Sequence, residues 1–157
     1  MEQVAEKTSV VRELEIGASP ETVWEFLVDP EKAPRWMGQS ADFDPRPGGL
    51  YRVEVIPGNV ALGEFVELDR PRRLVFTWGW EPGEHTESGV APGTSMIEIE
   101  LAPSGAGTTL RFSHTGLASE EAAQSHAHGW DHYLPRLVTA AGGGDAGVDP
   151  WTTGEMT

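Results

Sequence analysis

The sequence has no cysteine among its 157 residues, and it has few basic side chains. The absence of cysteine excludes disulfides, thiolate metal sites and thiol nucleophiles, and it fits a reducing compartment. Eleven Lys and Arg stand against 25 Asp and Glu, which gives a formal net charge of −14. Because this charge repels nucleic acid phosphates and anionic lipid headgroups, we expect neither nucleic acid nor membrane as a partner.

Long apolar runs are also absent, and none approaches the length that spans a bilayer. The charged segment 1–7 lacks the apolar region of a signal peptide, so a cytoplasmic protein is expected. No GxSxG sequence and no phosphate-binding glycine loop is found. We therefore expect no cofactor, and the length and the lack of repeats predict one domain.

The strongest helical pattern lies near the C-terminus, from Ser119 to about Ala141. Its apolar residues recur at three- and four-residue spacing, which places them on one face. They are Ala123, Ala127, Trp130, Leu134, Leu137, Val138 and Ala141. Only the strand-like segments between about residues 41 and 115 can cover that face. The sequence therefore predicts an α+β fold at 8–141, with a curved antiparallel sheet of about six or seven strands wrapped around a long C-terminal helix.

The segments on either side of this core have their own signals. Residues 8–16 alternate as a first strand, and Ser19 followed by Pro20 is typical of a helix start. A second short helix is expected after Asp29, limited by Pro34. Residues 142–157 begin with three glycines and have no periodicity, so they predict a flexible tail.

Strand parity predicts which side chains face the helix. Alternation places the following on the concave face: Tyr51, Val53, Val55, Leu74, Phe76, Trp78, Trp80, Ile97, Ile99, Leu101, Leu110, Phe112 and His114. The strand at 60–68 is ambiguous, because Leu62 and Val66 point one way and Phe65 the other, unless a bulge intervenes. The segment 81–93 is long, polar and rich in Gly and Pro, which allows it to act as a flap.

Several segments together resemble a known family. These are ASPETVWEFLVDPEKAPRWMG, FDPRPGG, GEFVELDRPRRLVFTWGW, GTTLRFSHTGL and HGWDHYLPRL, in this order. They resemble bacterial SRPBCC proteins with the START-like helix-grip fold, and within them the branch named after the activator of the heat-shock protein 90 ATPase. The resemblance covers about residues 8–140 and implies two short helices after the first strand. It leaves function open, because the superfamily includes ligand carriers, polyketide cyclases and a co-chaperone.

This sequence departs from the family pattern in two places. Ala33 and Pro34 stand where the family more often continues its second helix, so the cavity wall near Trp36 is expected to differ in shape. The eukaryotic co-chaperone also carries a separate N-terminal domain, for which this chain has no room. That difference weighs against a chaperone role.

Aromatic side chains on the concave face are the candidate ligand-binding residues. Trp78 and Trp80 lie two apart on one strand and offer a stacking wall, although core packing would explain them equally well. We expect a ligand cavity between the sheet and the last helix. Its candidate residues are Trp36, Tyr51, Trp78, Trp80, His114 and His126.

Two residues are candidates for proton transfer, His114 and Glu64. A lone inward histidine is more often structural, and Glu64 is a solvated acid if its strand bulges outward. His128 and His132 are four apart on the helix, which is a metal-ligand spacing, but they lie opposite Trp130 with no third ligand nearby. We therefore expect no metal.

Three functions remain in competition. The first is a small-molecule binding protein with an apolar, aromatic-lined cavity. The second is a cyclase or dehydratase acting on a polyketide-like substrate, which needs converging polar groups inside the cavity. The third is a chaperone-interacting module, for which an exposed apolar patch on the outer sheet face would be the sign. A homodimer is compatible with each of them.

Overall fold

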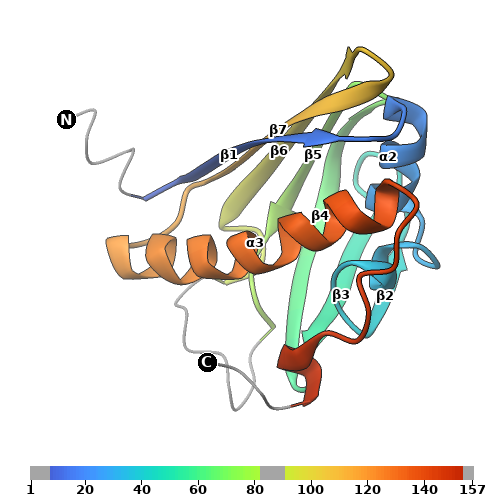
Figure 1. The fold of residues 1–157 in the computed structure, drawn as a ribbon. Coiled ribbons are helices and arrows are strands. Elements are labelled where there is room, and N and C mark those ends of the chain that lie inside the picture. Colours follow the sequence, from blue (N-terminus) through green and yellow to red (C-terminus); the bar gives the residue numbers. More distant parts are fainter. Residues whose placement is uncertain (1–7, 82–90, 154–157) are drawn as a thin grey trace.

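The computed structural model describes residues 8–81 and 91–153, which form one antiparallel sheet closed on one side by a long helix (Figure 1). The sheet order is β1-β7-β6-β5-β4-β3-β2. The elements are β1 (Val10–Ile16), α2 (Pro20–Val28), η1 (Ala33–Arg35), β2 (Ser40–Phe43), β3 (Leu50–Ile56), β4 (Asn59–Asp69), β5 (Arg73–Trp78), β6 (Ser95–Ser104), β7 (Gly107–Thr115), α3 (Glu120–Ala141) and η2 (Pro150–Thr153). The predicted helix-grip α+β fold is confirmed.

Both long helices begin where a serine caps them. The Ser19 Oγ accepts a hydrogen bond from the amide of Thr22, and the Ser119 Oγ accepts one from the amide of Ala122. Each bond satisfies an amide that the first helical turn leaves without a partner. These caps fix the start of α2 below one end of the sheet and the start of α3 at the other end (Figure 1).

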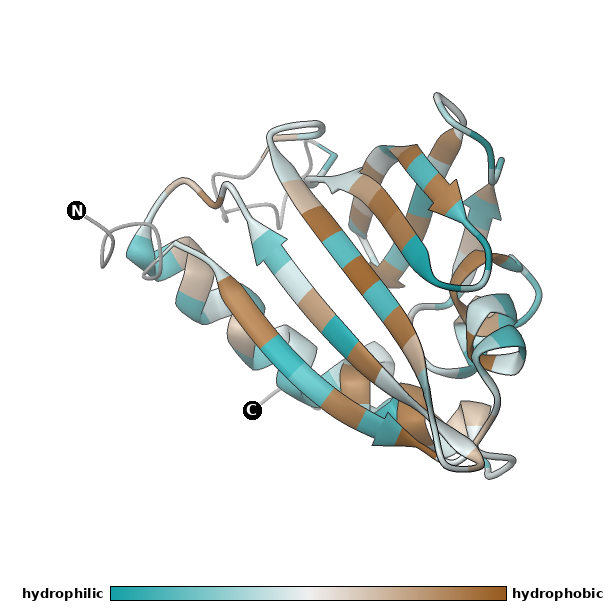
Figure 2. Cartoon of the chain, turned by 90° about the horizontal axis from the view of Figure 1, so that it is seen from above, coloured by the Kyte–Doolittle hydropathy of each residue, from teal (hydrophilic) through white to brown (hydrophobic). Residues whose placement is uncertain are grey.

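Alternation along the strands builds the core between the sheet and α3. Figure 2 shows hydrophobic and hydrophilic residues alternating along the strands, and in β6 the buried residues are Ser95, Ile97, Ile99 and Leu101. The predicted concave residues are buried, except that Trp80 lies just beyond β5 and is half-buried. On α3 the predicted apolar face is buried too, with Ala127 and Val138 at its edges.

A bulge resolves the ambiguous strand β4. The pairing of β4 with β5 shifts register between Phe65 and Glu67, so Phe65 is fully buried while Val66 is 43% exposed. The side chain of Glu64 is exposed, and its backbone amide donates a hydrogen bond to the Thr77 Oγ1. Of the two orientations left open for Glu64, the solvated one is therefore observed and the inward one is wrong, because the bulged strand places Phe65 and not its neighbours on the concave side.

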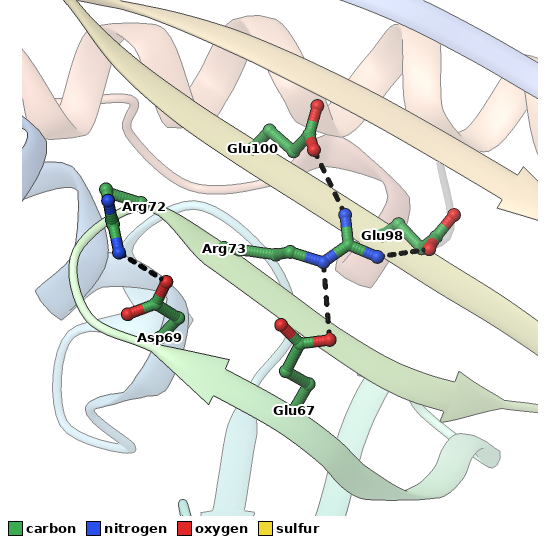
Figure 3. Close-up of polar contacts among 6 residues, drawn as sticks. All are labelled: Glu67, Asp69, Arg72, Arg73, Glu98 and Glu100. Atoms are coloured by element: carbon green, nitrogen blue, oxygen red, sulfur yellow. Dashed lines mark hydrogen bonds and ion pairs between the residues drawn. The ribbon is translucent and has the colours of Figure 1, made fainter.

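The convex face of the sheet is charged. Arg73 on β5 reaches three glutamates on the neighbouring strands, with donor–acceptor distances of 3.3 Å to Glu67, 2.6 Å to Glu98 and 3.1 Å to Glu100 (Figure 3). Large exposed apolar side chains of the described residues are scattered over different elements: Val11, Leu50, Val66, Met96 and Val148. The apolar outer patch that a chaperone-interacting module would need is not seen in the described part of the sheet.

The segment after α3 packs back onto the molecule. It leaves the end of α3 and runs down to β3, where η2 makes contact (Figure 1). Arg136 holds it by donating to the carbonyl oxygens of Ala146 and Gly147. Part of the expected flexible tail, 142–153, therefore has defined contacts, which the glycine-rich composition did not reveal. Residues 154–157 and most of the expected 81–93 flap lie outside the described residues.

Over the two ranges described, the helices fall short of the length and apolarity that crossing a bilayer requires.

Candidate functional site

A cavity of about 470 Å³ lies between α3, β3 and the end of β5, and η2 closes one side of it. Its volume falls within the roughly 300–1,000 Å³ typical of small-molecule sites. Its lining residues are mostly aromatic and apolar, with a few polar groups: Met37, Val55, Ile56, Asn59, Trp78, Trp80, Ser119, Glu121, Ala122, Ser125, His126, His128, Gly129, Trp130, Tyr133 and Trp151.

Three tryptophans form the floor of the cavity. Trp78 lies with its ring centroid 5.4 Å from that of Trp80 and 5.0 Å from that of Trp130. The first pair meets edge to face at 84°, and the second is tilted at 57°. Such contacts hold large rings in fixed orientations, which gives a ligand a rigid aromatic surface. Trp130, which the sequence places on the buried face of the helix, packs in the core and also lines the cavity.

His126 connects the helix to this aromatic floor. Its Nε2 accepts a hydrogen bond from the Trp80 indole at 3.0 Å, and its Nδ1 lies 2.8 Å from the Ala122 carbonyl oxygen, to which it donates. Both contacts require the neutral ring with the proton on Nδ1. Burial also lowers the pKa of His126, although the bond to Ala122 opposes this shift. His126 therefore faces the cavity as an uncharged group.

His114 lies behind the floor and not at the cavity. Its side chain is fully buried, its Nδ1 accepts from the Trp130 indole at 3.1 Å, and its Nε2 lies 2.8 Å from the Ser95 Oγ. The Ser95 hydroxyl donates to the Trp78 carbonyl oxygen, so it accepts from the His114 Nε2–H. Burial, with a smaller effect of His126, lowers the pKa of His114 to about 3. The ring has no nitrogen left for a substrate.

Two other predicted ligand residues also belong to the core. The Trp36 indole donates to the Phe26 carbonyl oxygen at 2.9 Å, and its neighbour Met37 is the residue that reaches the cavity. Tyr51 is stacked between Phe43 and Phe76 at centroid distances of 4.8 and 4.2 Å. The structure thus brings Trp78, Trp80 and His126 to the cavity, and it places Trp36, Tyr51 and His114 in the surrounding packing.

The C-terminal segment supplies a wall that the sequence pattern did not predict. Trp151 lies against His132 and Tyr133, and its ring faces the same space as Trp80 and Val55. The buried carboxylate of Asp149 anchors it by accepting from the Tyr133 hydroxyl at 2.6 Å and from the His132 Nε2 at 2.7 Å. The only advance sign was that Trp151 is the one aromatic side chain in a polar, glycine-rich segment.

Gly129 is another missed residue with a detectable signal. A glycine in the middle of a helix costs about 0.5–1 kcal/mol relative to alanine, so its presence in α3 calls for a reason. A Cβ at this position would meet no atom within 4 Å, which means that packing does not require glycine. Gly129 lines the cavity between Ser125 and Tyr133, one helical turn away on either side. Its missing side chain enlarges the cavity.

Metal binding finds no support at the two helix histidines. The His132 ring is stacked on Trp151 and bonded to Asp149, while His128 is exposed at the cavity edge. Across residues 8–81 and 91–153, no group of three or more His, Asp or Glu side chains is placed to hold a metal ion.

Both the sequence and the fold are similar to those of known proteins. Residues 17–142 match the family described as Activator of Hsp90 ATPase homolog 1-like protein. The solution structure of an AHSA1-like protein from Rhizobium etli is 44% identical, with a TM-score of 0.71 over 91% of this chain and 87% of the other. The crystal structure of CalU16 from Micromonospora echinospora is 27% identical, with a TM-score of 0.67 over 86% and 76%.

A more distant similarity concerns the fold alone. The Aha1 dimer from Colwellia psychrerythraea is 19% identical, with a TM-score of 0.70 over 87% of this chain and 98% of the other. No curated protein matches the chain. The family match spans most of the helix-grip domain, and the chain therefore belongs to the Activator of Hsp90 ATPase homolog 1-like family.

Proposed function

We propose that this protein binds an apolar, aromatic small molecule in the cavity between the sheet and α3. The observation that carries the proposal is a cavity of about 470 Å³ whose floor consists of Trp78, Trp80 and Trp130. Apolar clefts with a few fixed polar groups are the usual form of small-molecule sites, and tryptophan rings bind flat ligands by stacking.

The arrangement of polar groups favours binding over cyclase-like catalysis. General acid–base catalysis needs a titratable group within hydrogen-bond reach of the substrate. Both ring nitrogens of His114 are occupied by protein partners, and Glu64 lies exposed on the strand. The Tyr133 hydroxyl donates its hydrogen bond to Asp149. The two candidates for proton transfer are therefore unavailable inside the cavity, and the polar groups that remain orient a ligand.

Gly129 supports the same function. The glycine destabilises α3 by about 0.5–1 kcal/mol relative to alanine, and no neighbouring atom requires it. The absence of a side chain at this position leaves space in the cavity for a ligand. The lost side-chain volume lies next to Ser125, His126 and Tyr133, where a ligand would contact the helix.

The test is to fill the cavity from this position. N-phenyl-1-naphthylamine, an uncharged probe whose fluorescence rises in apolar surroundings, is titrated into the wild-type protein, Gly129→Leu and the matched control Gly129→Ala. We expect saturable binding to the wild type and to Gly129→Ala. In Gly129→Leu the affinity should fall by at least about tenfold, since a leucine would occupy space that the ring needs.

A second variant guards against a folding defect in the first. Ser125→Leu adds side-chain volume at the cavity rim. Because Ser125 is exposed, this substitution should not disturb the packing of the core. It should weaken probe binding by about threefold or more while leaving the melting temperature near that of the wild type. Absence of saturable binding to the wild type, or equal binding to all four proteins, would overturn the proposed function.

A further inference from the structure

The described lining of the cavity has a negative charge and no fixed positive charge. It contains no lysine or arginine, and its one carboxylate is that of Glu121. His126 is held neutral by its bonds to Trp80 and Ala122. His128 lies at the rim about two helical turns from Glu121, roughly 10 Å along α3, which is too far to neutralise that carboxylate. The cavity therefore favours a positive charge in a ligand over a negative one.

The aromatic rings of the lining add to this preference. The faces of tryptophan and tyrosine rings are negative and attract cations. Three of these rings also donate their polar hydrogen to an acceptor of the protein, which leaves more electron density on the ring. The donors are Trp80, Trp130 and Tyr133, and their acceptors are His126, His114 and Asp149, respectively.

The position of Glu121 indicates where the charge of a ligand would lie. Glu121, Ser125 and His128 are exposed lining residues that follow one edge of α3 at spacings of four and three residues. The neighbouring stripe of the helix, with His126 and Tyr133, is buried. The site therefore has an aromatic interior and a polar rim, and its carboxylate is at the rim.

The start of α3 does not reverse the negative charge of this rim. A helix N-terminus carries the equivalent of about half a positive charge, which the carboxylates of Glu120 and Glu121 in the first turn outweigh. Glu121 forms no ion pair with any residue in the two described ranges, so its carboxylate is available to a ligand. The formal net charge of −14 acts in the same direction at low salt.

Resting on the proposed function, we infer that the ligand is an aromatic amine, whose ring enters the cavity and whose ammonium group lies at the rim beside Glu121. The ammonium group donates to the Glu121 carboxylate and keeps its remaining contacts with water. The half-buried ring of Trp80, which is bonded to His126 about one turn further along α3, is the nearest aromatic surface for the cation. Glu121 is thus a specificity-determining residue. Fatty acids and other carboxylates are disfavoured, because no lining cation pairs with them.

The charge preference is tested with three naphthalenes that differ in one substituent. 1-Naphthylmethylamine, 1-naphthalenemethanol and 1-naphthoate are positive, uncharged and negative at neutral pH. Each competes with N-phenyl-1-naphthylamine for the wild-type protein at low salt. The amine should bind about fivefold more tightly than the alcohol, and the naphthoate at least about fivefold more weakly than the alcohol.

The outcomes separate this inference from the proposed function. If the amine binds no more tightly than the alcohol, or if the naphthoate binds most tightly, the inference about charge fails while the proposed function stands. If neither the three compounds nor N-phenyl-1-naphthylamine binds, the proposed function itself fails.

The role of Glu121 is tested against its neighbour Glu120. Both are exposed acids of the first turn, so Glu121→Gln and Glu120→Gln change the net charge and the helix start alike, but only Glu121 lines the cavity. The ratio of amine to alcohol affinity should fall by about threefold in Glu121→Gln and by less than about 1.5-fold in Glu120→Gln. Because both compounds are measured on the same variant, a folding defect cancels in the ratio. Equal changes in the two variants would overturn the assignment of Glu121.

Reversal of the charge supplies a measurement in the opposite direction. In Glu121→Lys, the introduced ammonium group should raise the affinity for 1-naphthoate relative to the alcohol by about threefold, whereas Glu120→Lys should leave this ratio within about 1.5-fold of the wild type. A gain of binding does not result from misfolding. High salt should reduce the gain, since the interaction lies at the exposed rim. An unchanged naphthoate ratio in Glu121→Lys would contradict the position assigned to the charged group.

Discussion

Trp151 stacks on His132 with ring centroids 3.8 Å apart and ring planes 10° apart, and the same tryptophan forms a wall of the cavity. This contact joins a residue outside the family-matched region, 17–142, to the helix that the family shares. The segment after α3 is therefore more than a terminus, because it completes the site. The buried Asp149 holds this segment in place, because its carboxylate accepts hydrogen bonds from His132 and Tyr133 on α3.

Removal of this wall should weaken ligand binding without unfolding the domain. In Trp151→Ala, we expect N-phenyl-1-naphthylamine to bind about three- to tenfold more weakly, because one aromatic surface of the site is lost. The melting temperature should change little, since Trp151 is only half-buried. Val148→Ala is the matched control, because Val148 belongs to the same segment and is 80% exposed. Equal affinity of Trp151→Ala and wild type would remove Trp151 from the site.

Asp149→Asn should destabilise the segment by about 1–3 kcal/mol, because an amide offers one acceptor where Tyr133 and His132 now use two. Burial alone would raise the pKa of Asp149, but the bonds from Tyr133 and His132 outweigh it, so the pKa is lowered. A lowered carboxyl pKa gives stability above the unfolded value of about 3.8, which is lost as the pH falls through the folded value. Urea unfolding of both proteins at neutral pH measures the difference. Identical midpoints would contradict the anchoring role.

His114 should make the protein less stable in mild acid. Its folded pKa of about 3 lies below the unfolded value of 6.5, so the unfolded state binds more protons between these pH values. Its contribution is fully present above the unfolded pKa and declines by up to about 1.4 kcal/mol per pH unit as the pH falls toward 3. Urea unfolding at about pH 7.5, 6 and 5 measures this slope.

His114→Gln serves as the comparison, since glutamine cannot take up the proton. Its pH slope should be flatter than that of the wild type, with a remainder from His126, whose pKa is also lowered by burial. In the wild type, the NMR signals of the His114 ring should not titrate between about pH 8 and 4.5. A ring that titrates near its ordinary value would show that His114 is open to water.

Gly129→Ala should stabilise the protein by about 0.5–1 kcal/mol, because alanine is the better helix former and its Cβ meets no atom within 4 Å. Chemical denaturation gives the free energy of unfolding. Gly142→Ala is a useful contrast, since a Cβ there would lie 2.9 Å from the Val138 carbonyl oxygen and should bring no such gain. A destabilised Gly129→Ala would mean that the space beside this residue is not free.

Arg73 on the convex face should contribute through its three partners together. Arg73→Met leaves Glu67, Glu98 and Glu100 without their shared cation, and we expect a loss of about 1–2 kcal/mol that shrinks at high salt. Arg72→Met is the control, because Arg72 forms a single exposed pair with Asp69 and should cost less than about 0.5 kcal/mol (Figure 3). Equal effects of the two substitutions would show that the network adds nothing.

The parts of the structure that depend on periodicity could be predicted from the sequence. The stripe on α3 and the alternation along β5, β6 and β7 identify the buried faces, and the Ser119 cap fixes where α3 begins. The bulge at Phe65 could be suspected from a conflict of parity but not placed. Periodicity tells which face a residue occupies, and this suffices to determine the fold.

The site was predicted less well, because a face contains both packing and cavity residues. Trp78 and His114 share the concave face, yet His114 is fully buried and lies at the edge of the Trp130 ring, where hydrogen bonds to Trp130 and Ser95 occupy both of its nitrogens. Tyr51 is likewise enclosed by Phe43 and Phe76. Trp151 reaches the cavity through a chain reversal that leaves no periodic signal. These distinctions depend on three-dimensional packing, which strand parity does not contain.

The central claim is that a ligand binds in the cavity beneath α3, and the six tryptophans allow it to be located in one measurement. Trp78, Trp80, Trp130 and Trp151 line the cavity, whereas Trp24 and Trp36 lie in the core away from it. In a ¹H–¹⁵N spectrum of the indole groups, added N-phenyl-1-naphthylamine should shift the four cavity signals and leave those of Trp24 and Trp36 in place. Shifts of all six to a similar extent, or of none, would contradict the account.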